Sequence, residues 1–85
     1  MPDRQPRRAL VIFHEVAEHQ VAALDDAALA RLDPHLTVIA LCPDIAGVRL
    51  HLDSPVLEYA EDGVRIAYLP IAFDTIVLIA HVEVH

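Results

Sequence analysis

The pair Asp62-Gly63 is the feature that most constrains how this chain can fold. It separates two runs rich in apolar side chains, residues 56–61 and 64–69. An Asp-Gly pair between such runs is a strong local signal for a β-hairpin with a two-residue turn, because that turn needs residues that tolerate positive φ angles. We therefore expect two antiparallel strands here, whatever the rest of the chain does.

A two-residue turn also sets the register of the two strands. The register predicts two facing pairs on the packed side (Tyr59 with Ile66, Leu57 with Tyr68) and a diagonal ion pair on the other side (Glu58 with Arg65). Both tyrosines of the chain belong to the packed side, so we expect them to be core residues.

Three segments before the hairpin are predicted to be strands. Residues 9–13 and 36–42 are short, continuous apolar runs, which are typical of strands buried on both faces. Residues 48–53 alternate instead, and this alternation predicts a strand with Val48, Leu50 and Leu52 facing inward.

Between the first two of these segments, residues 15–32 place apolar side chains at steps of three and four residues. This spacing predicts an alanine-rich amphipathic helix. Asp25-Asp26 is able to break this helix and cap a second short one, and Asp33-Pro34 is expected to end the helical region.

The last thirteen residues, 73–85, are predicted to form the final strand. At a period of two, its two faces carry different side chains. One face is apolar (Ile76, Leu78, Ala80, Val82, Val84), and the other changes from apolar to polar along its length (Thr75, Val77, Ile79, then His81, Glu83, His85).

Together these segments predict an α+β domain with a single mixed sheet. The strand–helix–strand start favours a parallel crossover, the later strands favour an antiparallel meander, and one amphipathic helix covers one face. Residues 1–7 are expected to form a loose N-terminal arm, and residues 8–85 a single domain. A five-stranded small barrel with an N-terminal helix is the main alternative.

Three of the predicted strands, residues 8–13, 37–41 and 73–78, resemble the first half of DJ-1/PfpI domains. The resemblance implies a flavodoxin-like fold, and members of that family use a cysteine nucleophile. No catalytic residue is carried over to this chain. Cys42 follows an early strand rather than standing at a strand–helix elbow, and the chain reads His-Val-Glu-Val-His where the family has a glycine-rich turn.

Composition bounds the partners that we expect. Hydrophobic residues make up 55% of only 85 residues, which is hard to bury in one small domain and predicts a homo-oligomer or a fixed partner. The net charge of −7 and the absence of lysine argue against nucleic acid. No run approaches the roughly 20 apolar residues of a membrane span. A single cysteine fits a reducing compartment, so we expect a cytoplasmic protein without a membrane partner.

The alternate residues His81, Glu83 and His85 are the one set with a chemical interpretation beyond packing. Imidazole and carboxylate groups suit Zn²⁺, Ni²⁺ or Cu²⁺, and His51 with Asp53 would complete a site if their strand, or a second chain, lay alongside. Two other interpretations stay open: a polar edge that discourages strand pairing, and a pH-sensitive interface. No other cofactor is expected.

Two further histidines, His14 and His19, frame the run His-Glu-Val-Ala-Glu-His. They are five residues apart, so they point in different directions on a helix and do not match the zinc-protease spacing. Ordinary surface pairs with Glu18 and Glu15 are expected instead. Cys42 is expected to be a small buried hydrophobic residue.

No serine–histidine–aspartate arrangement or phosphate-binding loop is recognisable. The sequence therefore predicts a small, cytoplasmic, self-assembling or partner-binding protein that is more consistent with a non-enzyme. The alternatives are a transition-metal-binding protein and, third, an enzyme in which a histidine beside a carboxylate performs acid–base catalysis.

Overall fold

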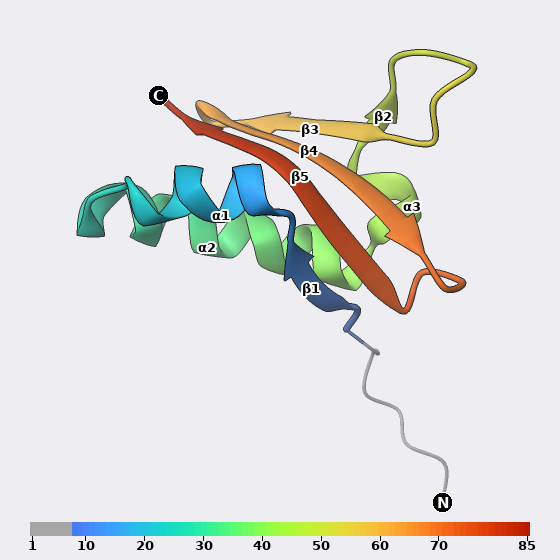
Figure 1. The fold of residues 1–85 in the computed structure, drawn as a ribbon, viewed down its shortest axis with the longest axis horizontal. Helices are drawn as coiled ribbons and strands as arrows, with labels where there is room; N and C mark the ends of the chain where they lie inside the picture. Colours follow the sequence, from blue (N-terminus) through green and yellow to red (C-terminus); the bar gives the residue numbers. More distant parts are fainter. Residues whose placement is uncertain (1–7) are drawn as a thin grey trace, which may run out of the picture.

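The computed structural model describes residues 8–85, which form one five-stranded sheet with helices (Figure 1). The predicted N-terminal arm, residues 1–7, lies outside the described residues. In chain order the elements are β1 Leu10–Phe13, α1 Glu15–Ala22, α2 Asp26–Leu41, α3 Pro43–Ala46, β2 Val48–Arg49, β3 Leu57–Glu61, β4 Val64–Ile71 and β5 Ile76–Val84. None of the described helices is long and apolar enough to cross a membrane.

The sheet has the strand order β1-β5-β4-β3-β2. β1 pairs with β5 in parallel, and the other neighbours are antiparallel. The predicted α+β class, single mixed sheet and antiparallel meander are therefore confirmed. The parallel partner of β1 is different from the expected one, because it is the last strand rather than residues 36–42.

The hairpin around Asp62-Gly63 has the predicted geometry. Both turn residues have positive φ, 53° and 78°, as the two-residue turn requires. The facing pairs are Leu57 with Tyr68 and Tyr59 with Ile66, and all four side chains are buried.

The predicted strand at residues 36–42 is wrong, because this segment is the C-terminal half of α2. Its buried residues, Ile39 and Ala40, lie seven and eight positions after Leu32, so all three share one helical face. A continuous apolar run of this length cannot distinguish a strand from a buried helix by its period. The DJ-1/PfpI resemblance loses one of its three strands here.

Pro34 lies inside α2, although the sequence predicted that the helix would end there. A proline in a helix interior removes one backbone hydrogen bond, here the one that would reach the carbonyl of Ala30. The helix continues because Leu32 before the proline and Ile39 after it are both buried in the core. The predicted break at Asp25 is confirmed, since the Asp25 carboxylate caps α2 by accepting from Ala28 N at 2.8 Å.

The strand predicted at residues 48–53 is also mostly wrong. Only Val48 and Arg49 pair with β3, and Leu50 and Leu52 are 60% and 94% exposed rather than inward-facing. The chain bends directly afterwards, where Ser54 N donates to the carbonyl of His51 at 3.1 Å. Both His51 and Asp53 are exposed in this loop.

A β-bulge changes which residues of β5 face the core. Ala67 pairs with His81 and Tyr68 pairs with Ile79, so Ala80 is an extra residue in β5. Val77 and Ile79 are buried before the bulge and Val82 is buried after it. The predicted face that joined Leu78, Ala80 and Val82 is therefore wrong, because a strict period of two does not continue through a bulge.

One face of the sheet is covered and the other is open. Ala17 of α1 and Leu32 and Ile39 of α2 pack in one cluster with the inward side chains of β3, β4 and β5. Both helices therefore cover the same face (Figure 1). Residues next to the core side chains along each strand point to the opposite, open face.

Candidate functional site on the open face of the sheet

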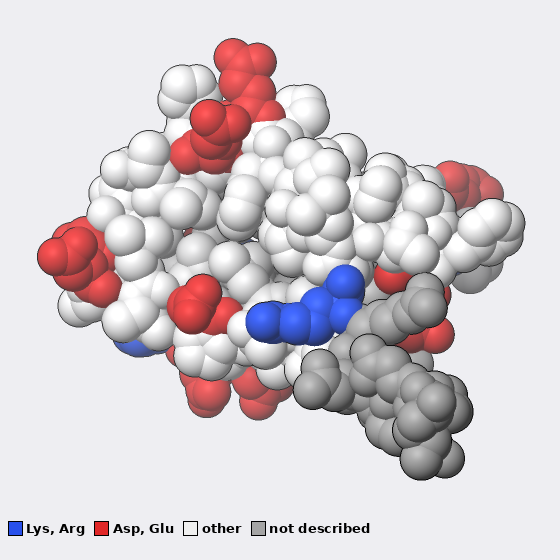
Figure 2. All heavy atoms as spheres, turned by 90° about the horizontal axis from the view of Figure 1, so that it is seen from below, with Lys and Arg blue, Asp and Glu red and all other residues white. Residues whose placement is uncertain are grey.

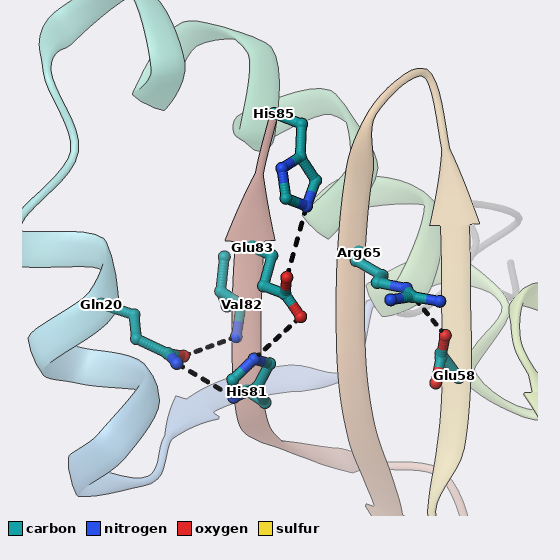
Figure 3. A network of polar contacts seen from close by, with 7 residues as sticks. All are labelled: Gln20, Glu58, Arg65, His81, Val82, Glu83 and His85. Atoms are coloured by element: carbon teal, nitrogen blue, oxygen red, sulfur yellow. Dashed lines mark hydrogen bonds and ion pairs between the residues drawn. The ribbon is translucent and has the colours of Figure 1, made fainter.

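Three side chains at the end of β5 form a row on the open face (Figure 3). Glu83 lies between two imidazoles: its Oε2 is 3.1 Å from Nε2 of His81, and its Oε1 is 3.3 Å from Nε2 of His85. The bulge at Ala80 places this row, because it turns Val82 into the core and leaves its neighbours outside. The predicted grouping of the three residues on one face is therefore present.

Gln20 of α1 fixes the ring of His81. The Gln20 Oε1 accepts from the backbone N–H of Val82 at 2.7 Å, so its amide nitrogen is the group that donates to Nδ1 of His81, at 2.9 Å. In a neutral His81 ring, Nδ1 is then the acceptor, and Nε2 carries the proton that is donated to Glu83. A helix side chain thus sets the tautomer of a strand histidine.

The Gln20 contact also covers part of the edge of β5. β1 pairs only with Ile76–Ile79, so the later residues of β5 extend beyond it. The side chain of Gln20 replaces a strand there by binding the N–H of Val82. No pattern in the sequence indicates that Gln20 covers this strand edge, because a glutamine on a helix surface is ordinarily solvated.

Glu83 is held ionised by its neighbours. The hydrogen bond from His81 is the main cause that lowers the pKa of Glu83 below its ordinary value of 4.5. Desolvation opposes this effect, and the charge of His81 and the contact with His85 lower the pKa further.

The neighbouring strands add an ion pair to this row. Arg65 of β4 faces Glu83 in the register, and its Nε is 3.0 Å from Oε1 of Glu58 on β3. This is the diagonal pair that the hairpin predicted. Charged groups on three adjacent strands therefore lie at one end of the open face (Figure 3).

His85 is held in place through its backbone. Its N–H donates to the carbonyl of Gly63 at 2.8 Å, and its carbonyl accepts from Arg31 of α2 at 2.6 Å. The other guanidinium nitrogen of Arg31 donates to the carbonyl of Asp62 at 2.7 Å. Arg31 therefore ties the hairpin turn to the end of β5.

Among the three residues of the row, His85 is the one suited to proton transfer. Both ring nitrogens of His81 and both oxygens of Glu83 have partners within the row or from Gln20. In the described part of the chain only Nε2 of His85 is engaged, so its Nδ1 can meet a ligand. His85 and Arg65 also line a hollow of about 160 Å³ beside the hairpin.

The predicted metal site is not supported. Residues 8–85 contain no group of three histidine, cysteine or acidic side chains arranged to hold a metal ion. Glu83 uses its oxygens as acceptors for the two imidazoles. His51 and Asp53 follow β2, which is separated from β5 by β3 and β4, so they cannot complete a site within this chain.

The remaining candidates have structural roles. Glu15 and His19 approach to 3.9 Å as an exposed pair, while His14 caps α1 by accepting from Val16 N at 3.4 Å instead of pairing with Glu18. Cys42 is half-buried between α2 and α3.

One contact that the sequence did not reveal lies on the covered side of the sheet. The hydroxyl of Tyr59 is hydrogen-bonded to Nδ1 of His35 on α2. Burial raises the pKa of the Tyr59 phenol, with added effects of Glu61 and Asp62, so this group stays neutral.

The other end of the open face is apolar. Leu10 faces Ile76, Ile12 faces Leu78, and β4 continues the row on the far side of β5. Its residues, which we call the apolar row, are Leu10, Ile12, Leu69, Ile71, Ile76 and Leu78. Leu10 is 60% exposed and Ile12 is 42% exposed. An exposed apolar surface of this kind is typical of a protein–protein interface.

No family model and no curated protein matches this chain. Solved structures do match it in fold. A chain of the RelBE2 toxin–antitoxin complex from Mycobacterium tuberculosis superposes with a TM-score of 0.81 at 19% identity, covering 98% of both chains. A chain of the intact E. coli RelBE toxin–antitoxin complex gives a TM-score of 0.73 at 19% identity, covering 91% of this chain and 96% of the other.

The isolated E. coli RelE toxin also shares the fold, with a TM-score of 0.73 at 18% identity over 91% of this chain and 85% of the toxin. This likeness overturns the prediction of a non-enzymatic, self-assembling protein of unknown role, because the chains that share this fold are toxins and their complexes. The alternative of a metal-binding protein is contradicted as well, since these structures are described as toxins and residues 8–85 hold no metal site.

The predicted partners are also wrong. A homo-oligomer was expected, but the chains with this fold occur in complexes with a different protein, the antitoxin. The exclusion of nucleic acid is not supported either, whereas the exclusion of a membrane partner stays a prediction. Both rested on a net charge of −7 and on composition, which are sums over the chain and do not describe any particular surface.

Proposed function

We propose that this chain is a toxin-type protein that works in a heteromeric pair with an antitoxin-type partner in the cytoplasm. The observation that carries the proposal is the two-way coverage of the fold, 98% of this chain and 98% of a chain from a toxin–antitoxin complex. The whole of this small domain, rather than one shared motif, therefore corresponds to such a protein. The lone cysteine is consistent with a reducing compartment.

The surface supports a permanent protein partner. The apolar row leaves large side chains in water on the face opposite the helices. Burying them against another chain would give about 25 cal/mol for each Å² of apolar surface removed from water. A second protein chain is the occupant that the fold comparison favours, because the neighbours of this fold include chains solved together with an antitoxin.

The test is regulated expression of the full chain in a bacterial host. We expect growth to stop on induction, and co-expression of an antitoxin-type partner to restore growth and to co-purify with this chain in a fixed ratio. Sedimentation analysis of the purified material then gives the stoichiometry. Normal growth at confirmed expression of folded protein, with no complex formed, would contradict the proposal.

A second candidate function, proton transfer by His85, is favoured by one specific observation. His85 is oriented by Glu83 and anchored by Arg31, and it lines a hollow together with Arg65. A histidine that is held by a carboxylate and has its other nitrogen available is suited to general acid–base catalysis.

The growth experiment separates this role from partner binding. We expect His85→Ala to abolish growth arrest while the variant still co-purifies with the partner, because the His85 backbone contacts do not need the imidazole. His19→Ala is the matched control, since the exposed His19 side chain on α1 contacts Glu15 rather than the row. Full arrest by the His85 variant would exclude the catalytic role and leave the toxin-type function untouched.

A further inference from the structure

β1 forms one edge of the sheet, and the direction of its backbone groups can be assigned. Leu10 N donates to the carbonyl of Thr75 and His14 N to that of Ile79, both at 2.8 Å. In a parallel ladder alternate residues bond to the same neighbour. The N–H and C=O groups of Val11 and Phe13 therefore point away from β5, and no described strand pairs with this side.

A groove of about 320 Å³ runs along that edge, between β1 and α2. Its lining is mainly apolar and includes Val11, Phe13, Leu36 and Ala40. Two contacts hold its walls together at one end: Ala9 N donates to the carbonyl of Ala40 at 2.8 Å, and Arg8 donates to Thr37 at 3.0 Å. Seen from below, this side of the molecule is mostly uncharged, with basic and acidic side chains close together on it and further acidic side chains around its rim (Figure 2).

The two charged residues of the groove have opposite signs and lie at different points along it. Arg8 precedes β1 and contacts α2 near its C-terminal end, whereas Asp33 lies more than one helical turn earlier in α2. Both side chains are exposed. A segment in the groove would therefore meet a positive charge near the start of β1 and a negative charge further along.

β1 also lacks the usual protection of an edge strand. Natural edges carry lysine, proline, a bulge or an inward charge, which discourage pairing with another chain. The four residues of β1, Leu-Val-Ile-Phe, include none of these, and the strand is regular. The opposite edge is different, because β2 has only two residues and offers little to pair with.

We propose that β1 accepts an extended segment of the partner protein as an additional, antiparallel strand. The segment would bond to the outward backbone groups of Val11 and Phe13 and place an apolar side chain against Leu36. The charges of the groove complement a segment with a basic residue before its apolar centre, near Asp33, and an acidic residue after it, near Arg8. This inference rests on the proposed function, because it states where and in what conformation the partner binds.

The probe is a cyclised hairpin peptide whose free strand reads Lys-Val-Thr-Val-Glu, titrated into the ¹⁵N-labelled full chain. We expect the amide signals of Val11 and Phe13 to shift and to exchange more slowly with solvent. Methylating the peptide amides that face β1 should weaken binding at least tenfold, because the hydrogen bonds between the two backbones are lost. Swapping the positions of its lysine and glutamate should weaken binding at least threefold, because each side chain would then face a like charge.

A pair of protein variants tests the same edge. Val11→Pro removes the outward N–H while the bonds to β5 remain, so binding should fall at least tenfold; Val11→Ala keeps the N–H and should bind within about threefold of the original chain. If circular dichroism shows that Val11→Pro is unfolded, the methylated peptide decides the question with the protein unchanged.

Three results would overturn the inference: equal binding of the methylated and original peptides, shifts confined to another surface, or a dimer of this chain that the peptide dissociates. A partner that binds the original chain and a folded Val11→Pro variant equally well would show that β1 is not the binding edge. The proposed function would be unaffected. Peptide binding at β1 without growth arrest or complex formation would count against the proposed function alone.

Discussion

At the scale of single residues, Glu83 is the centre of the row, because its two carboxylate oxygens contact the imidazoles of His81 and His85. The sequence placed His81, Glu83 and His85 on one strand face, and the structure brings their side chains together. The sequence could not reveal that Gln20 would bind His81. Nor could it reveal that β3 and β4 would separate β5 from the loop with His51 and Asp53. The short-range spacing was therefore predictable, and the ligand set was not, because it required contacts between distant segments.

The lowered pKa of Glu83 predicts a dependence of stability on pH. Since the folded-state pKa lies below the ordinary value of 4.5, ionised Glu83 contributes to the free energy of unfolding above about pH 4.5. This contribution disappears as the pH falls through the folded-state pKa. We expect His81→Ala to raise the Glu83 pKa toward 4.5, as followed by carboxyl carbon NMR, because the main hydrogen bond is removed.

The control for this titration is His19→Ala, which should leave the Glu83 signal unchanged because His19 contacts Glu15 instead. A Glu83 pKa of 4.5 or more in the original chain, or the same value in the His81 variant, would show that the hydrogen bond does not hold the carboxylate ionised.

At the scale of elements, the sequence predicted best where local chemistry decides the structure. The Asp62-Gly63 turn fixes its strands through two positive φ angles, and the Asp25 cap starts α2 through one hydrogen bond. Residues 36–42 were misjudged because their apolar run fits either a strand or a helix face, and only packing against the sheet chooses between them. The bulge at Ala80 was likewise not visible, since it depends on how β4 meets β5.

Pro34 leads to a prediction about α2. It is exposed and occupies an interior helix position, so Pro34→Ala should restore the N–H bond to Ala30 without losing core contacts. Interior prolines cost about 3 kcal/mol relative to alanine in general. We expect the free energy of unfolding in urea to rise by about 1–3 kcal/mol.

Pro55→Ala is the matched control, because Pro55 is also exposed but lies in a loop. In this loop the substitution only increases the conformational entropy of the unfolded chain. The free energy of unfolding should therefore fall by about 0.4–1 kcal/mol. A decrease of similar size for Pro34→Ala would mean that the proline is needed for the shape of α2.

At the scale of the whole molecule, the excess of apolar residues correctly indicated that some apolar surface is not buried within this chain. The apolar row and the unprotected edge of β1 are that surface. Composition could not say what covers it, because the same exposed area suits a second copy or a different protein. Under the proposed function the surface is covered by a different protein, and that proposal rests on three-dimensional shape rather than on any sum over residues.

The pairing of β1 with β5 has a consequence for how the protein is made. β5 lies between β1 and β4, so the strand that joins β1 to the rest of the sheet is synthesised after the other four strands. Until residues 76–84 have been synthesised, β1 has no neighbour and the row that ends in His85 does not exist. A nascent chain that ends before residue 76 therefore has neither a paired β1 nor this row.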